Sequence, residues 1–163
     1  MHYLPFSYLI SALLLGSAQA LAVEAIVDKG PASHLQYSNE NIPWQAAPKS
    51  LEAGAEVAVL EGNPAEAGVF TMRIKMPDGF RISPHWHPNV ERVTVLSGTF
   101  KLGSGETFDA NNTEVLLPGS YTAMPPKMRH YAVAEGETVI QLTSVGPWII
   151  HYIDKQDDPR LRD

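Results

Sequence analysis

Residues 79–98 read GFRISPHWHPNVERVTVLSG, and this stretch decides how the rest of the chain is interpreted. In a β-strand the side chains of residues i and i+2 share a face, so His85 and His87 point the same way. Glu91 follows four residues later, across Pro88-Asn89, which predicts a turn and then a second strand. Two imidazoles and a carboxylate that converge can hold Fe, Mn, Ni, Cu or Zn.

A third histidine, His130, lies far from this stretch along the chain. A closed antiparallel barrel can nevertheless bring distant strands to one interior. A lone histidine is usually a core or surface residue. A His-x-His pair with a nearby glutamate and another histidine on a distant strand instead favours a metal site.

The rest of the chain has the pattern of an all-β protein. Its 163 residues include 13 prolines and 12 glycines, which indicate many turns, and 44% are hydrophobic, which is enough for a core. Apolar residues alternate with polar ones from Val69 to Met76, as in a half-buried strand. Short strands separated by turns predict a barrel or sandwich. We expect them at 56–60, 69–76, 90–102 (broken near Ser97-Gly98), 114–117, 121–124, 129–134 and 138–143.

The composition excludes several classes of function. The chain has no cysteine, so it holds no disulfide, thiolate nucleophile or cysteine-ligated zinc or iron–sulfur site. Its formal charge of −6 and pI near 5.4 argue against a nucleic-acid partner, because phosphate binding needs a basic surface.

Residues 1–20 resemble a secretory signal peptide. The apolar run Leu9 to Leu15 is followed by small residues at Ala18 and Ala20, and cleavage after Ala22 fits almost as well. The run is too short to span a bilayer. Because the segment has no Lys or Arg, a buried N-terminal helix or an anchor stays the alternative. We expect a periplasmic or secreted protein with no membrane span after cleavage.

We expect a single domain after this leader. Residues 21–55 are predicted to form an N-terminal arm that packs across a sheet, with Trp44 as its apolar anchor. Residues 56–153 are predicted to form the barrel, and residues 154–163 a charged tail.

Two spacings resemble the motifs of the cupin superfamily. The first cupin motif is similar to residues 79–98. Here five residues separate Gly79 from His85, one separates His85 from His87, three separate His87 from Glu91, and six separate Glu91 from Gly98. The second cupin motif resembles residues 119–130, in which five residues separate Gly119 from Pro125 and His130 follows. In the second motif Lys127 replaces a glycine and Ala134 replaces the terminal asparagine. The end of the chain, from Gly146-Pro147-Trp148, is similar to small stand-alone bacterial cupins.

The resemblance covers roughly residues 57–142 and implies a double-stranded β-helix, the cupin jelly roll. It also implies one divalent transition metal per chain, with Fe or Mn favoured, and a homodimer in which the arm around Trp44 reaches the partner. The implied metal ligands are His85, His87, Glu91 and His130.

Strand alternation places apolar side chains around this metal. If Glu91 faces inward, Val93 and Val95 do too, and Ala132 and Ala134 share the face of His130. Tyr131 has the opposite parity and is expected to pack outside. Tyr121 and His151 are the candidate proton-transfer residues, although each has a packing role as its alternative.

Three hypotheses follow for the function. The first is a mononuclear metal enzyme acting on a small organic molecule, with dioxygenase chemistry leading and non-redox isomerase, lyase or hydrolase chemistry open. The second is a non-catalytic module that binds or senses a small molecule or a metal. The third, a structural barrel without metal, is disfavoured because such a barrel needs no converging ligands.

Overall fold

The computed structural model describes residues 30–162, so the predicted leader at residues 1–20 lies outside the described residues. Within residues 30–162 the regular structure is nine β-strands and three short 3-10 helices, with no α-helix. No helix of this range is long and apolar enough to cross a membrane. The strands are β1 (Gln45–Ala46), β2 (Glu56–Glu61), β3 (Gly68–Met76), β4 (Arg81–Trp86), β5 (Glu91–Ser104), β6 (Glu114–Leu116), β7 (Tyr121–Met124), β8 (His130–Gly146) and β9 (His151–Tyr152).

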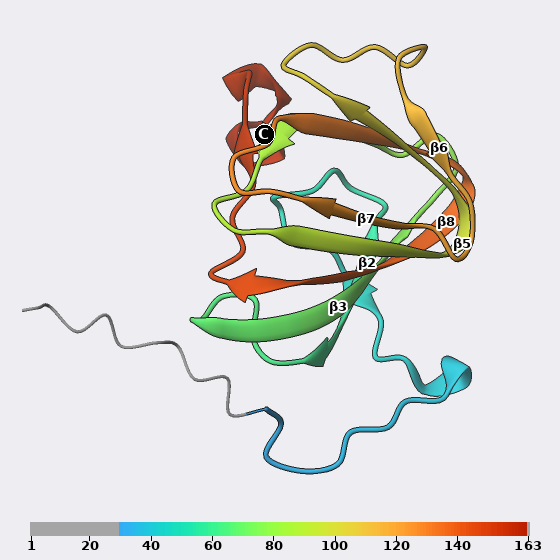
Figure 1. The fold of residues 1–163 in the computed structure, drawn as a ribbon, viewed down its shortest axis with the longest axis vertical. Coiled ribbons are helices and arrows are strands. Elements are labelled where there is room, and N and C mark those ends of the chain that lie inside the picture. Colours follow the sequence, from blue (N-terminus) through green and yellow to red (C-terminus); the bar gives the residue numbers. More distant parts are fainter. Residues whose placement is uncertain (1–29, 163) are drawn as a thin grey trace, which may run out of the picture.

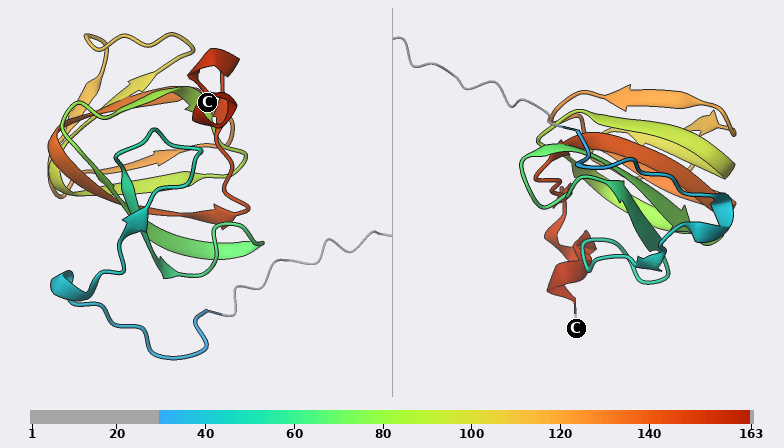
Figure 2. Two further views of the ribbon diagram at one scale, coloured as in Figure 1. Left: turned by 180° about the vertical axis from the view of Figure 1, so that it is seen from behind. Right: turned by 90° about the horizontal axis from the view of Figure 1, so that it is seen from below.

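Two long strands organise the barrel. β5 and β8 run antiparallel, from the pair Arg92–Thr143 to the pair Ser104–His130 (Figure 1). β8 also pairs with β3 and β4, whereas β5 also pairs with β6 and β7. The order β1-β2-β3-β8-β4-β9 completes the sheet, which curls into a barrel when seen from further sides (Figure 2). This confirms the predicted all-β jelly roll.

The predicted break near Ser97-Gly98 is wrong. β5 is one strand whose register against β8 shifts between Val95 and Thr99. Gly98 takes a positive φ of 73°, and a Cβ there would lie 2.4 Å from the carbonyl oxygen of Glu137. Only glycine fits this bend, so the strand turns the corner of the barrel without ending. β8 is continuous in the same way, where the sequence predicts two strands.

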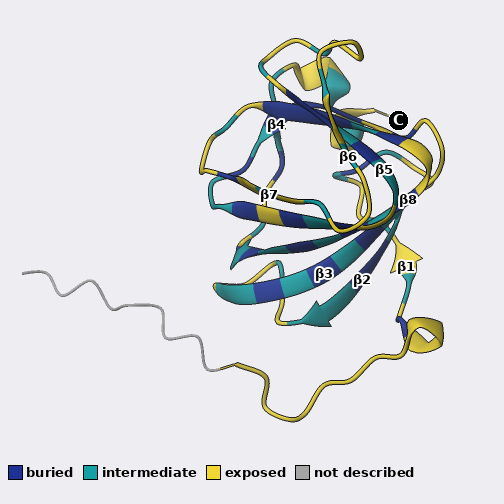
Figure 3. Ribbon diagram, turned by 45° about the vertical axis from the view of Figure 1, so that its right-hand side comes forward, coloured by how far each residue is buried: buried dark blue, intermediate teal, exposed yellow. Residues whose placement is uncertain are grey.

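The barrel interior is filled by alternating apolar residues. The even-numbered members of β3 from Phe70 to Met76 are all buried, as the alternation predicts. Val93 and Val95 of β5 are buried too, and Figure 3 shows the buried positions alternating along the strands. The even-numbered residues of β8 from Ala132 to Leu142, apart from Gly136, line the same core.

The arm packs on the barrel differently from the prediction. Trp44 is half-buried, with the ammonium of Lys75 4.8 Å from its ring centroid. Within residues 30–55 the buried apolar residues are Ile42, Leu51 and Ala55. Leu51 lines the central pocket and Trp44 does not, so Leu51 is the arm residue that reaches the barrel interior.

The C-terminal residues fold back on the barrel. Two 3-10 helices, Lys155–Asp157 and Pro159–Leu161, follow β9. The guanidinium of Arg160 donates to the carbonyl of Ile150 at 2.8 Å, and Arg162 pairs with Glu52 of the segment before β2. The end of the chain is therefore tied to the same side of the barrel as Leu51.

Candidate metal centre

Three strands bring the four predicted ligands together. His85 belongs to β4 and His87 follows that strand directly, whereas Glu91 opens β5 and His130 opens β8. His85 and His130 are register partners across β4 and β8. All four side chains are buried, with 3 to 5% of their surface exposed.

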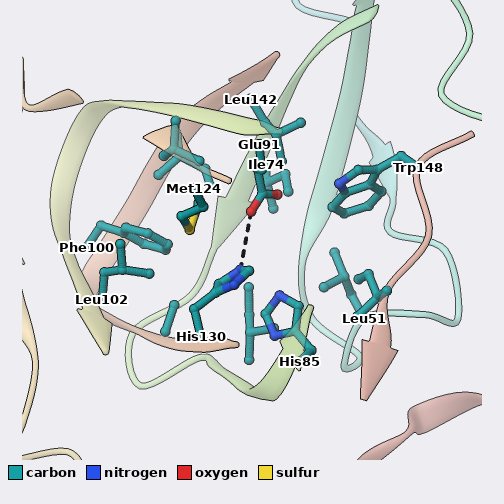
Figure 4. A pocket seen from close by; sticks show the side chains of 15 residues that line it. Leu51, Ile74, His85, Glu91, Phe100, Leu102, Met124, His130, Leu142 and Trp148 are labelled. Atoms are coloured by element: carbon teal, nitrogen blue, oxygen red, sulfur yellow. Dashed lines mark ion pairs between the residues drawn. The ribbon is translucent and has the colours of Figure 1, made fainter. Parts of the chain in front are cut away.

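The ligand atoms lie close enough to share one ion. The candidate ligand nitrogens of His85, His87 and His130 all lie within 4.8 Å of one another. One carboxylate oxygen of Glu91, Oε2, lies 3.4 Å from Nε2 of His87 and 3.3 Å from Nε2 of His130. Figure 4 shows Glu91 and His130 facing each other inside the barrel, with His85 beside them.

Each imidazole is fixed in the tautomer that a metal needs. Nδ1–H of His85 donates to the carbonyl of Ser83 at 2.7 Å, and that of His130 to the carbonyl of Met128 at 3.0 Å. Nδ1–H of His87 donates to the carbonyl of Ile149 at 2.9 Å. The proton on Nδ1 leaves Nε2 with a free lone pair, the arrangement typical of metal-ligating histidines.

The buried environment shifts the pKa values of His85, His87 and Glu91. It holds the pKa of His85 well below its usual range, and the imidazoles of His130 and His87 add to the effect. Burial also lowers the pKa of His87. Burial favours the neutral acid of Glu91, but the imidazoles of His87 and His130 outweigh it and lower its pKa to about 2. At neutral pH His85 and His87 are therefore neutral, and Glu91 is ionised.

The short loop between His87 and Glu91 is fastened from two sides. The Asn89 amide donates to the carbonyl of Val145 at 2.8 Å, and the Ser144 hydroxyl donates to that of Val90 at 2.7 Å. The backbone N–H of Lys127 donates to the carbonyl of His87 at 2.8 Å.

Lys127 carries backbone strain at this contact. It is the one non-glycine residue within residues 30–162 with a positive φ, 64°, at the place where the second cupin motif has a glycine. A lysine adopts this conformation at a cost of about 1 to 2 kcal/mol. Lys127 therefore holds a backbone conformation that suits the glycine it replaces in the second motif.

A narrow apolar pocket opens onto the ligands. It holds about 360 Å³ of atom-free space with its mouth included, but the centre of a water molecule fits in only about 20 Å³ of it. The smaller volume describes the closed part of the pocket, and it indicates space for one or two water molecules. Twelve of its fifteen lining residues are apolar, and the others are His85, Glu91 and His130.

The structure does not bring the predicted proton-transfer residues to this pocket. Tyr121 is 60% exposed on β7, and His151 stacks on Trp86 with ring centroids 4.0 Å apart. Neither lines the pocket, because each points to the outer side of its strand. This placement gives their predicted catalytic role no support.

Three further residues differ from expectation or were missed by it. Tyr131 points outward as predicted, yet it is fully buried because the segment around Phe108 covers it. Leu51 and Trp148 line the pocket although the sequence pattern does not mark them as pocket residues. Both lie outside regular strands, where alternation gives no signal.

The residues present fit a divalent transition metal. Nε2 of His87 is buried and has no hydrogen-bond donor or acceptor among residues 30–162. Within the same range no Lys or Arg pairs with the buried carboxylate of Glu91. A buried charge and a buried lone pair without partners are unfavourable, and a cation satisfies both. Three imidazoles and one carboxylate suit Fe, Mn, Ni, Cu or Zn.

Comparison with known proteins agrees with this geometry. Residues 33–151 match the family described as "Domain of unknown function (DUF4437)". The chain belongs to this family. The solved structures that it resembles share the fold of the DUF4437 protein. No curated protein matches it.

Three of these solved structures show the fold that the DUF4437 protein shares. The polyketide cyclase RemF from Streptomyces resistomycificus has a TM-score of 0.64 at 16% identity, over 78% of this chain and 90% of its own. An acetylacetone dioxygenase from Acinetobacter johnsonii has a TM-score of 0.58 at 18% identity, over 78% of this chain and 82% of its own. An RmlC-like cupin from Shewanella frigidimarina has a TM-score of 0.54 at 18% identity, over 70% of this chain and 91% of its own.

Proposed function

We propose that this cupin is a mononuclear metal-dependent enzyme acting on a small organic molecule, with dioxygenase chemistry as its leading reaction. One observation carries the proposal: three buried imidazoles, each with its Nδ1–H donated to a backbone carbonyl, and the ionised Glu91 converge at the end of an apolar pocket. Their surroundings keep them ready to bind a cation without rearrangement.

The chain's own residues hold the ion and exclude water. His85, His87 and His130 would donate Nε2, and Glu91 would donate Oε2. When bound, a divalent metal supplies Lewis acidity and, for iron, redox capacity, with coordination positions left open for small molecules. The apolar lining of the pocket excludes bulk water and strengthens electrostatic interactions near the ion.

The absence of a second acid or base in the pocket favours oxygen chemistry over isomerisation or elimination. The titratable residues that line the pocket within residues 30–162 are His85, Glu91 and His130, all of them assigned as ligands. Isomerases and lyases move protons and need a positioned group for that. A dioxygenase that receives its substrate as an anion does not. The fold shared with an acetylacetone dioxygenase is consistent with this choice.

We favour Fe or Mn as the metal. A site of three nitrogens and one oxygen binds several divalent ions, so availability decides the occupant as much as geometry does. Redox chemistry with O2 excludes redox-inert Zn, and among the redox-active ions we choose Fe or Mn.

A non-catalytic binding protein is the second candidate. The same observation favours it, because binding needs no acid or base beside the metal ligands. Such a protein would retain the metal and a small ligand but would not consume O2.

In the test, metal-free protein is first loaded with Fe(II) under anaerobic conditions. It is then moved to oxygenated buffer, where an oxygen electrode follows O2 consumption. A panel of small carboxylates and β-diketones serves as substrates, and protein loaded with redox-inert Zn(II) is the control. Substrate-dependent O2 uptake in the Fe(II) protein alone supports the enzyme. Tight metal binding without uptake across the panel contradicts the dioxygenase and favours the binding protein.

We also propose that the protein is exported and dimeric. The signal-peptide pattern of residues 1–20 supports export, and the exposed apolar residues Leu35 and Tyr37 of the arm support a partner surface. Mass spectrometry of protein from its own host is expected to show loss of the first 20 or 22 residues. Sedimentation is expected to give twice the chain mass; an intact N-terminus or a monomer contradicts the respective proposal.

A further inference from the structure

Trp148 presents an unpaired hydrogen-bond donor to the metal pocket. It lines the pocket, and its Nε1–H is shielded from solvent and has no acceptor among residues 30–162. Figure 4 shows the indole nitrogen on the edge of the ring that faces the pocket interior. An N–H left unpaired in an apolar environment is unfavourable, so an acceptor supplied by a ligand would be favoured there.

The indole is held rigidly beside the metal ligands. Its ring stacks on His87 with centroids 5.2 Å apart and planes 14° from parallel. The backbone N–H of Trp148 donates to the carbonyl of Pro64 at 2.7 Å, and the next carbonyl, of Ile149, accepts from Nδ1–H of His87. A donor fixed in this way loses little entropy when a ligand binds.

The remaining lining limits what the ligand can be. Apart from the metal ligands and Trp148, the pocket wall is aliphatic, phenyl or, at Met124, thioether, and no Lys or Arg of residues 30–162 lines it. A ligand with polar groups at both ends, such as a dicarboxylate or a sugar, would leave one end unpaired, which is unfavourable. A ligand with one oxygen-bearing end and an apolar remainder matches both parts of the pocket.

We infer that Trp148 is a substrate-binding residue whose Nε1–H donates to the oxygen-bearing end of a small, otherwise apolar anion, a monocarboxylate or an enolate, bound at the metal. The inference rests on the proposed metal site and names the class of molecule that site accepts. The metal and the indole N–H then hold the same end of the ligand. The aliphatic side chains take the rest and move apart to do so, because the closed pocket has room for only one or two waters.

The test uses propionate as the probe. Zn(II), which is diamagnetic, is the metal for NMR, and Co(II), which absorbs visible light, is the metal for titration. In Zn(II) protein labelled with 15N, the chain's three tryptophans give three indole N–H signals. The signal missing from Trp148→Phe belongs to Trp148. On addition of propionate we expect this signal to move downfield, as it does when an N–H gains an acceptor, while the signals of Trp44 and Trp86 stay in place.

Affinity gives a second, independent measurement. Propionate is titrated into Co(II) protein and followed by the visible absorption of the metal. Trp148→Phe keeps the ring but removes the N–H, and we expect it to raise the Kd about tenfold, the size of one hydrogen bond to a charged group. Trp44→Phe, the same change on the outside of the barrel, is the matched control and is expected to leave the Kd unchanged.

The outcomes separate this inference from the proposed function. Failure of the unmodified protein to bind Zn(II) or Co(II) contradicts the metal site itself. Metal binding without propionate binding contradicts the ligand class. Propionate binding with an unmoved Trp148 signal, or with equal affinity in Trp148→Phe, overturns the role of Nε1–H. A downfield shift of the Trp148 signal alone, with the loss of affinity confined to Trp148→Phe, supports it.

Discussion

The two ends of the central pocket are built in different ways. At the metal end, every functional group is fixed by a directional contact: the three Nδ1–H groups each donate to a backbone carbonyl, and the loop before Glu91 is bonded to its neighbours. Along the wall, aliphatic side chains such as Ile74 and Leu142 fill space by strand alternation. Hydrogen bonds there pair the backbones, not the side chains.

This difference separates two properties that the pocket needs. The metal end sets which ion is held and in which form, because its side chains are few and polar. The wall contributes stability to the whole barrel and sets which molecule fits. A change at one end is therefore expected to leave the property of the other end largely intact, and four predictions examine this separation.

The largest effect is expected at the metal end. His85→Ala removes one ligand, whereas loss of a group behind a ligand already lowers metal affinity about 10 to 100-fold. We expect His85→Ala to lose at least about 100-fold in affinity while its circular dichroism stays that of the barrel. His34→Ala, which removes an exposed histidine of the arm, is the control and is expected to keep full metal content. If both variants retain one metal ion per chain, the metal site lies elsewhere in the protein.

The second effect concerns the wall. Leu142 is 1% exposed and lines the pocket, so Leu142→Ala leaves a cavity in the core. The expected loss is about 2 to 5 kcal/mol of unfolding free energy, measured by urea denaturation of the metal-free protein. Elemental analysis is expected to find the metal still bound. Loss of the metal together with stability contradicts the separation of the two ends.

Removing the metal is expected to have an intermediate effect. A ligand at about 100 times its Kd stabilises the native state by about 2.7 kcal/mol. For a chain of this size that corresponds to roughly 5 to 10 °C in Tm. Chelation is expected to lower the Tm of the unmodified protein by this amount and to leave that of His85→Ala unchanged. Equal shifts in the two proteins point to a chelator effect unrelated to the site.

The smallest effect is expected at Lys127. Its positive φ of 64° strains a lysine but suits a glycine. Relief of that strain is partly offset by the greater freedom of glycine in the unfolded chain, so Lys127→Gly is expected to stabilise the protein by up to about 1 kcal/mol. Metal affinity is expected to stay the same. A clear destabilisation on urea denaturation would show that the lysine side chain contributes an interaction that outweighs the strain.

The same two ends differ in how well the sequence predicts them. His85, His87 and Glu91 lie in one short motif; strand periodicity predicts that the two imidazoles share a face, and the resemblance to the cupin motif implies that Glu91 joins them. The alternation of Phe70 to Met76 likewise predicts a buried face, which the structure confirms. Both signals depend on neighbours along the chain.

What the sequence does not predict depends on contacts between distant segments. Leu51 and Trp148 enter the pocket from irregular segments, so no periodicity marks them. β5 and β8 continue through their bends because pairing with each other outweighs the local turn signal at Ser97-Gly98. Tyr121 and His151 have side chains suited to proton transfer, but the outward parity of their strands keeps them from the pocket.

Elemental analysis of the purified protein tests the central claim most directly. Protein incubated with Fe(II) without oxygen, then freed of excess metal, is analysed by mass spectrometry alongside His85→Ala. We expect one transition-metal ion per chain in the unmodified protein and almost none in the variant. A folded, unmodified protein that retains no transition metal contradicts the account, because the four converging side chains would then have another role.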